Sequence, residues 1–323
     1  MINLTITENE DNQRLDRFLK KYFKSAPLSY IYKLIRKDVK LNGRRAKIET
    51  MLVSGDELCI YVSEEEAQSY QEQKERPMAK KQFQIAYEDE NIIVVVKPFG
   101  LLTHGDHLEK KNHLANQVSG YLAEKGEYKP GRERTFVPSP VNRLDRNTTG
   151  LVIFGKNNKS LQSLNKMIRE KGYVRKYYLT VVSGHLRKEL QLKDKMEKDG
   201  NRNVVTVLDM EDANGKVMET IARPLKYANG YTLVEVELVT GRTHQIRVHL
   251  ANAGYPIIGD VKYGDRRVNE KVAVEFGLTT QFLHAYRLFF EDGIEPLAYL
   301  KGKEVIGVLP PYLEEIKDEL FGK

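Results

Sequence analysis

An aspartate between two arginines is the part of this chain best suited to chemistry. Asp145 lies between Arg143 and Arg146 in the segment VNRLDRNTTGL, just before the apolar residues 151–154. Nearby cations favour the charged form of a carboxylate, which can then act as a nucleophile or a base. The arginines would also attract an anion, so the segment indicates chemistry on a phosphate-bearing substrate. For this segment alone, the alternative is a surface turn in which Asp145 pairs with an adjacent arginine.

A second basic segment, LVTGRTHQIRVH, places Arg242, His244, Arg247 and His249 within eight residues. It is expected to form a helix over 244–253. With 3.6 residues per turn, Arg242 and Arg247 need not point the same way. The two histidines are five residues apart, which is not the i, i+4 spacing of a helical zinc site, so no metal is expected. The alternative for this segment is a basic helix that binds phosphate only.

The composition indicates an anionic partner. The chain has 323 residues, enough for two domains, and its 52 Lys and Arg against 45 Asp and Glu give a net charge of +7. The N-terminus is polar and acidic, without the apolar core of a signal peptide, and no apolar run is long enough to span a membrane. We therefore expect a cytoplasmic protein that does not associate with membranes.

The positive charge is concentrated near the N-terminus. Residues 12–47 contain twelve Lys or Arg and only two acids. Apolar spacing predicts one helix over 15–23 and a second after the break at 25–27, followed by a strand at 39–41 and a tight turn at 42–43. So uneven a distribution of charge indicates a surface that binds an RNA backbone rather than one that only contacts water. The expected RNA-binding residues are Lys33, Arg36, Lys37, Arg44 and Arg45.

The rest of the chain predicts a separate, larger domain. Residues 64–84 are charged, rich in glutamine and poor in apolar residues, which is typical of a linker between domains at 1–63 and 85–323. Beyond the linker, strands outnumber helices and several have hairpin spacing. We expect an α+β fold with a mixed, mainly antiparallel sheet flanked by helices. Strands are predicted at 92–96, 177–182, 203–208 and 232–238, and helices at 114–122, after 158 and at 309–321.

Five segments in this order resemble the RluA-type family of uridine-to-pseudouridine synthases. They are the KPFGL motif at 97–101 and the segments 142–150, 176–184, 241–249 and 254–264. Near the N-terminus, RLDRFL at 14–19 and VKLNG at 39–43 resemble the ribosomal-protein-S-four-like RNA-binding domain. The chain departs from the synthase pattern at Asn142, where the family usually has histidine, and at Thr149 and Thr180. Asn142 puts a supporting hydrogen bond in question.

The resemblance implies a pseudouridine synthase-like catalytic domain joined to a small N-terminal α/β RNA-binding domain. The implied activity is isomerisation of uridine to pseudouridine in structured RNA, with large-subunit ribosomal RNA as the expected substrate. Neither a cofactor nor a metal is expected, because the reaction involves no redox change, and no obligate protein partner is evident. The alternatives are a non-catalytic RNA-binding protein on a synthase scaffold and a synthase that acts on transfer RNA.

The resemblance also implies roles for individual side chains. Asp145 would be the catalytic carboxylate, and the sequence leaves open whether it attacks the ribose, attacks the base or removes a ribose proton. Arg247 would pair with Asp145 and orient it. Tyr178 would stack on the extruded uracil, Ile246 would pack against it, and Arg143 would fill the space that the base vacates. The remaining substrate-binding candidates are Arg242 and His244.

Overall fold

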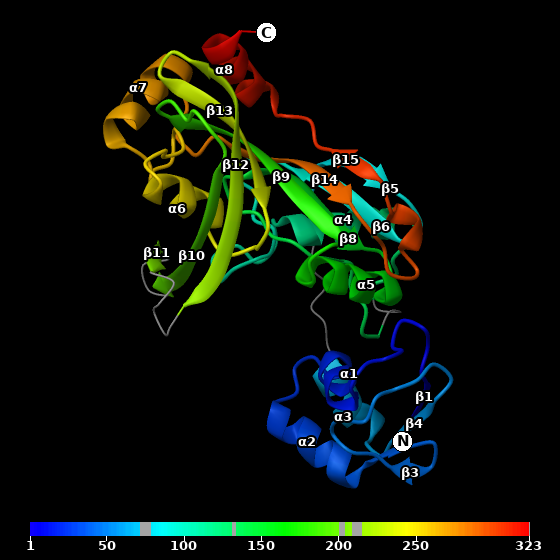
Figure 1. Ribbon diagram of the computed structural model, residues 1–323. Helices are drawn as coiled ribbons and strands as arrows, with labels where there is room; N and C mark the ends of the chain where they lie inside the picture. Colours follow the sequence, from blue (N-terminus) through cyan, green and yellow to red (C-terminus); the bar gives the residue numbers. More distant parts are fainter. Residues whose placement is uncertain (72–78, 131–133, 200–203, 209–214, 323) are drawn as a thin grey trace.

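The chain forms a small N-terminal unit and a larger sheet with flanking helices (Figure 1). The computed structural model describes residues 1–71, 79–130, 134–199, 204–208 and 215–322. Within this part of the chain no helix is both long and apolar enough to cross a membrane.

The N-terminal unit is a four-stranded sheet covered by helices. Its strand order is β1-β4-β2-β3. Asn42 and Gly43, at the predicted tight turn, both have positive φ, 50° and 75°, which is the geometry of a two-residue hairpin turn. The two predicted helices are present, and their apolar faces pack into one core. The elements are β1 (Ile2–Thr5), α1 (Leu15–Tyr22), α2 (Leu28–Lys37), β2 (Val39–Leu41), β3 (Arg44–Arg45), β4 (Glu57–Ile60) and α3 (Glu64–Gln71).

Helix α3 lies within the range 64–84 that was expected to be a linker. Its Ala67 is buried in the N-terminal core, and the Tyr70 ring lies 4.6 Å from the Tyr30 ring. A helix with so few apolar residues is held by these tertiary contacts, which its composition does not reveal. The described part of the N-terminal unit therefore extends to Gln71.

The large sheet is mixed and mainly antiparallel, as predicted. Its strand order is β11-β10-β12-β13-β9-β14-β8-β6-β5, with β15 on β14 and β7 on β8. The pair β14 and β8 is parallel, whereas β9 is antiparallel to both β13 and β14, and β6 is antiparallel to β8. The strands are β5 (Gln84–Glu88), β6 (Ile92–Lys97), β7 (Ser139–Pro140), β8 (Thr149–Gly155), β9 (Val174–Ser183), β10 (Leu190–Asp199), β11 (Val204–Leu208), β12 (Lys216–Ala228), β13 (Tyr231–Leu238), β14 (Leu283–Phe290) and β15 (Glu304–Ile306).

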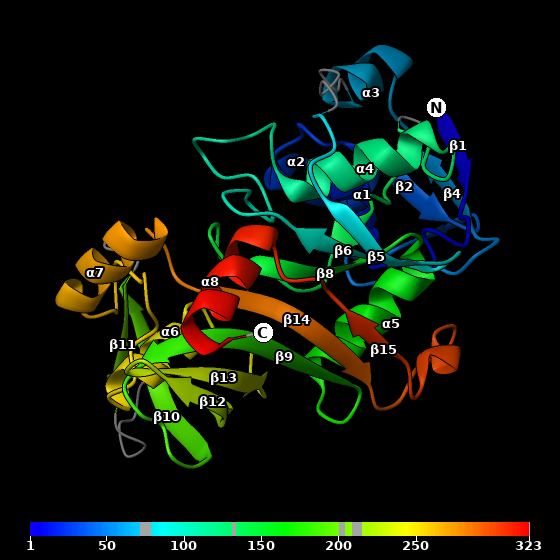
Figure 2. The ribbon, with the colours of Figure 1, turned by 90° about the horizontal axis from the view of Figure 1, so that it is seen from above.

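Helices cover the large sheet on both sides. In Figures 1 and 2, α6 and α7 lie at the β10–β11 end, whereas α5 lies near β8. Helix α7 was not predicted, although Asp265 caps its first turn by accepting a hydrogen bond from the Val268 N–H and Gly277 ends it with positive φ. The helices are α4 (Leu114–Glu124), α5 (Asn158–Arg169), α6 (Gln245–Asn252), α7 (Arg266–Phe276) and α8 (Pro311–Phe321), with a short 3-10 turn η1 (Ala298–Leu300).

The centre of the sheet is buried on both faces. Alternate residues of β6 enter two cores: Ile93 and Val95 pack on the side of α4, and Ile92 and Val94 pack on the side of α5. Strand β8 is buried along its whole length in the same way. The loop that carries Asp145 therefore leads directly into a strand that cannot shift without disturbing both cores.

The N-terminal unit contacts the large domain through polar groups near α5 (Figure 1). The Asn158 N–H donates to Asn9 Oδ1 at 3.2 Å, and Gln13 Nε2 donates to Thr135 Oγ1 at 3.2 Å. Arg134 Nη1 donates to the Thr5 carbonyl at 2.8 Å. The contact between the two units thus includes directional hydrogen bonds.

Candidate active site

Three distant parts of the chain bring the predicted catalytic residues together. Asp145 lies in the loop before β8, Tyr178 in the middle of β9 and Arg247 on α6. Arg247 Nη1 donates to Asp145 Oδ2 at 3.0 Å; the Asp145 side chain is 27% exposed and that of Arg247 is 6% exposed. The partner of Asp145 in the described part of the chain is thus Arg247 and not an adjacent arginine. The surface-turn alternative for this segment was therefore wrong.

A buried carboxylate fixes Arg247. Arg247 Nε and Nη2 donate to the two oxygens of Asp260 at 2.6 and 2.8 Å, and Asp260 is 1% exposed. Burial disfavours both charges, but the hydrogen bonds and the mutual attraction outweigh it, so that the pKa of Arg247 is raised and the pKa of Asp260 is lowered. This two-point pair leaves Nη1 free to reach Asp145.

Side chains also hold the backbone on either side of Asp145. Thr103 Oγ1 donates to the Leu144 carbonyl at 3.1 Å and accepts from the Leu144 N–H at 3.2 Å. Asn142, which replaces the family's usual histidine, donates through Nδ2 to the Leu151 carbonyl at 3.1 Å and accepts at Oδ1 from the Ile153 N–H at 2.9 Å. Asn142 thus fastens the loop to β8 by two hydrogen bonds.

Lys97 joins two loops beneath the site. It ends β6, it is fully buried, and its Nζ donates to the carbonyls of Pro98, Leu101 and Arg146 at 3.0, 2.7 and 2.9 Å. Burial lowers the pKa of Lys97 to about 7, against an opposing effect of the Asp145 charge. The bond to Arg146 fixes the backbone immediately after Asp145.

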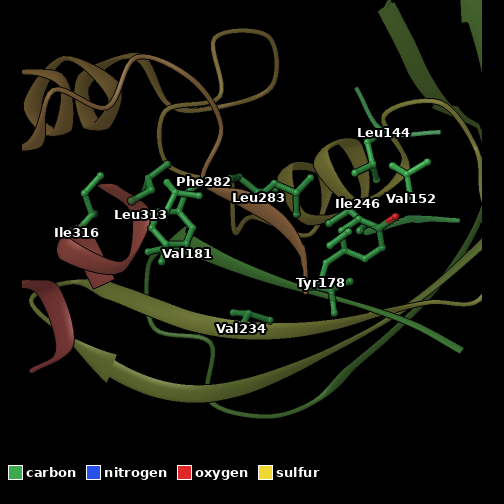
Figure 3. Close-up of a cluster of buried hydrophobic side chains, with 14 of the residues drawn as sticks. Leu144, Val152, Tyr178, Val181, Val234, Ile246, Phe282, Leu283, Leu313 and Ile316 are labelled. Atoms are coloured by element: carbon green, nitrogen blue, oxygen red, sulfur yellow. The ribbon is translucent and has the colours of Figure 1, made fainter. Parts of the chain in front are cut away.

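An apolar wall lies beside the carboxylate. Tyr178 and Ile246 are buried and pack in one cluster with Leu144, the residue before Asp145, as Figure 3 shows. Burial, with an added effect of the Asp145 charge, raises the pKa of Tyr178, so its hydroxyl keeps its proton at neutral pH. An uncharged planar base is the kind of group that such a wall accepts.

The start of α6 is a strained turn held by a glutamine. His244 has φ 54°, which is unusual for a residue other than glycine. Gln245 Oε1 accepts from Thr240 Oγ1 at 2.8 Å and from the Arg242 N–H at 3.0 Å, and its Nε2 donates to Thr220 Oγ1 at 2.9 Å. This buried amide ties the loop to β12 and determines where α6 begins.

Two predicted substrate-binding residues take no part in the ion pair. Arg242 is exposed, and its Nε donates to the Val217 carbonyl at 3.4 Å. Arg143 is exposed, and no ion pair of its guanidinium occurs among the residues whose positions are described. By contrast, His244 Nε2 lies 3.9 Å from Asp145 Oδ2. The structure therefore groups His244, but not Arg242, with the carboxylate.

Besides Thr103 and Asn142, four further residues that build this site were not predicted as site residues. They are Lys97, Gln245, Asp260 and Tyr263, and all four lie within the segments that carry the family resemblance. Nothing local in the sequence shows that Asp260 faces Arg247. In the described part of the chain, no group of three or more His, Cys, Asp or Glu side chains could hold a metal ion.

The burial of Lys97 predicts a pH-dependent stability. Its pKa is about 7 in the folded chain and has an ordinary value of 10.5, so between these values the unfolded chain binds more protons. The free energy of unfolding of the wild type, minus that of Lys97→Met, should therefore rise with pH across this window, by up to about 1.4 kcal/mol per pH unit. Urea denaturation at a series of pH values measures it.

Lys110→Met, at an exposed position of the neighbouring loop, controls for the loss of any lysine. A difference for Lys97→Met that stays flat or falls as the pH rises would show that Lys97 is not buried as described.

Known proteins resemble this chain in the region that carries the site. Residues 91–252, which span the Asp145 loop, β9 and α6, match the family model described as RNA pseudouridylate synthase. An uncharacterized RNA pseudouridine synthase of Mycoplasma capricolum is 33% identical over 95% of this chain and 97% of its own length. The ribosomal large subunit pseudouridine synthase C of Escherichia coli is 36% identical over 89% of this chain and 88% of its own length.

Solved structures share the fold. Human RNA Pseudouridylate Synthase Domain Containing 4 aligns with a TM-score of 0.58 at 21% identity over 73% of this chain and 92% of its own. Human RNA Pseudouridylate Synthase Domain Containing 1 aligns with a TM-score of 0.52, also at 21% identity, over 71% and 83%. With the family match, these relatives and the residues at the site, the chain belongs to the RNA pseudouridine synthase family.

Proposed function

We propose that this chain isomerises uridine in structured RNA with Asp145 as its catalytic carboxylate. The observation that carries the proposal is the placement of Asp145, which Arg247 holds at 3.0 Å beside the apolar wall of Tyr178 and Ile246. A carboxylate kept in a fixed position next to a binding surface for a planar base suits the making and breaking of a bond to ribose.

The reaction breaks one bond between uracil and ribose and forms another. The C1′–N1 bond of uridine breaks and its electron pair stays with the uracil. The base then turns, C5 bonds to C1′, a proton leaves C5 and N1 takes one up. Asp145 can attack the ribose, attack the base or remove a ribose proton. In each case Arg247 orients the carboxylate and balances its charge.

The target base must first leave its stack in the RNA, at a cost of a few kcal/mol. We assign Arg143, which is exposed two residues before Asp145, to fill the vacated space. Tyr178 and Ile246 would receive the uracil. Because its pKa is raised, Tyr178 would act there through its ring rather than as a base.

The N-terminal unit supplies a surface for the RNA backbone. The five predicted residues are all exposed, and no ion pair is found for them among the described side chains. Free cations of this kind neutralise phosphates and release counterions. The expectation of an S-four-like domain stays a prediction. The residues are Lys33 and Arg36, with Lys37 at the end of α2, and Arg44 and Arg45 on β3.

We further propose that the RNA is large-subunit ribosomal RNA. Relatives covering most of this chain are named ribosomal large subunit pseudouridine synthase C, in Escherichia coli and in Vibrio cholerae. Transfer RNA is the alternative substrate. The non-catalytic alternative is disfavoured because Asn142, the one feature that supported it, keeps two hydrogen bonds to β8. The cytoplasmic location stays a prediction.

Replacing Asp145 tests the catalytic assignment. Asp145→Asn keeps the shape of the side chain but removes its charge, so turnover should fall by at least about 10³-fold while RNA affinity changes little. The substrate is ribosomal RNA tritiated at C5 of uridine, prepared from cells that lack this protein, and released tritium is counted. Asp292→Asn, on an exposed turn, is the matched control. An Asp145→Asn protein that keeps the wild-type rate would remove Asp145 from the chemistry.

Neutralising the end of α2 tests the RNA surface. Changing Lys33, Arg36 and Lys37 to Gln should weaken binding to the same RNA. It should also reduce the slope of log K against log salt by up to about 0.7–0.9 for each phosphate that the variant no longer neutralises. Filter binding at several salt concentrations measures both. The double variant Lys33→Arg and Lys37→Arg, which keeps the charge, should bind as the wild type does. An unchanged slope in the triple variant would place this face outside the interface.

A further inference from the structure

His244 presents an unpaired ring nitrogen to the catalytic carboxylate. The residue is 9% exposed, yet its Nε2 lies 3.9 Å from Asp145 Oδ2, beyond hydrogen-bond distance, and no other acceptor for it occurs among the residues described. The strained turn that Gln245 stabilises aims the ring there. A ring nitrogen that faces a reaction site without a hydrogen-bond partner is a candidate for contact with the substrate.

The contact of the other ring nitrogen, Nδ1, determines which nitrogen of His244 carries the proton. Its Nδ1 lies 2.9 Å from the Tyr263 hydroxyl, and that oxygen already accepts from the Val205 N–H at 2.9 Å. Burial raises the pKa of Tyr263 and lowers the pKa of His244, so the phenol keeps its proton and the imidazole is neutral at pH 7. Tyr263 therefore donates to Nδ1, and the imidazole proton is on Nε2.

The positions of its two carbonyls suit uracil to a single fixed hydrogen-bond donor. Turning the base about its N3–C6 axis exchanges N1 with C5, as the reaction requires, and at the same time exchanges the O2 and O4 carbonyls. A donor that bonds one carbonyl before the turn can bond the other after it. Cytosine would exchange a carbonyl for an amino group, which leaves donor against donor in one of the two orientations.

We propose that His244 is a uracil-recognition residue whose Nε2–H donates to a carbonyl of the extruded base both before and after it turns. The inference rests on the proposed function and adds the basis of base selection. A donor at a carbonyl also stabilises the negative charge that the uracil carries while it is detached from ribose. Tyr263 is then a positioning residue, because it acts through the tautomer of His244.

Variants of His244 give the first test, with single-turnover tritium release from a large-subunit ribosomal RNA transcript tritiated at C5 of uridine. His244→Phe removes the donor and should lower the rate by about 10²-fold. His244→Gln, which can place an amide N–H near the position of Nε2, should recover about tenfold of that loss. His185→Phe, a surface histidine stacked on Tyr227, is the control and should leave the rate unchanged.

Two further measurements separate base recognition from support of Asp145. Tyr263→Phe keeps the ring that lies 5.2 Å from the Arg247 guanidinium but removes the hydroxyl beside His244 Nδ1. The rate of this variant should be about threefold to tenfold lower than that of the wild type. In a transcript of 4-thiouridine tritiated at C5, sulfur replaces one carbonyl oxygen and is a poor acceptor. Relative to its own rate on uridine, the wild type should slow on this transcript by about tenfold more than His244→Phe does. The variant has no hydrogen bond from residue 244 for the sulfur to weaken.

Equal slowing of both enzymes on the 4-thiouridine transcript would overturn the inference and assign His244 to the support of Asp145 alone. A His244→Phe enzyme as fast as the wild type would overturn it as well. No tritium release by the wild type would instead contradict the proposed function. RNA affinity of each variant, from filter binding, confirms that a slow enzyme is still folded.

Discussion

The ion pair between Arg247 and Asp260 is the interaction on which the site depends. Asp260 takes two of the guanidinium nitrogens and leaves the third for Asp145. Taking both charges out of water is costly, and such pairs contribute little to net stability. Here the pair matters because it fixes the orientation of Arg247. A planar guanidinium fixed at two points can hold a third group in one place. The aromatic ring of Tyr263 also contacts the guanidinium, whose central carbon lies 5.2 Å from the ring centroid.

A similarly small set of hydrogen bonds holds the opposite side of the site. The backbone around Asp145 is fixed by Thr103, Asn142 and Lys97, which come from two separate loops and the end of β6. Strand β8 anchors that loop between two cores, and β9 brings Tyr178 beneath it. The large sheet thus serves as a rigid frame on which three short segments meet.

Much of this could be predicted from the sequence, because the periodic segments are strong. The buried strand at β6, the helix after Arg242 and the hairpin turn at Asn42-Gly43 each have a local signature, and each is present. The pairing of Arg247 with Asp145 followed from family resemblance. By contrast, the long strands β10 and β12 were missed because they are half exposed and carry many charges, so that their alternation is weak.

Other features depend on contacts between distant residues and leave no local trace. Helix α3 is stabilised by packing of Ala67 and Tyr70 on the N-terminal core. Asp260 lies thirteen residues after Arg247 and faces it only because α6 and the following turn fold together. The Tyr263 hydroxyl, which contacts His244 Nδ1, is in turn held by the Val205 N–H of β11. Pattern analysis of one sequence cannot pair such residues.

The most direct measurement is the single-turnover rate of Arg247→Lys on tritiated ribosomal RNA. Lysine keeps the charge but cannot bind Asp260 at two points while also reaching Asp145. If Arg247 acts by orientation, the rate should fall by about 10²-fold, with RNA affinity nearly unchanged. A lysine enzyme that works at the wild-type rate would contradict the account, because a point charge alone would then suffice to support Asp145.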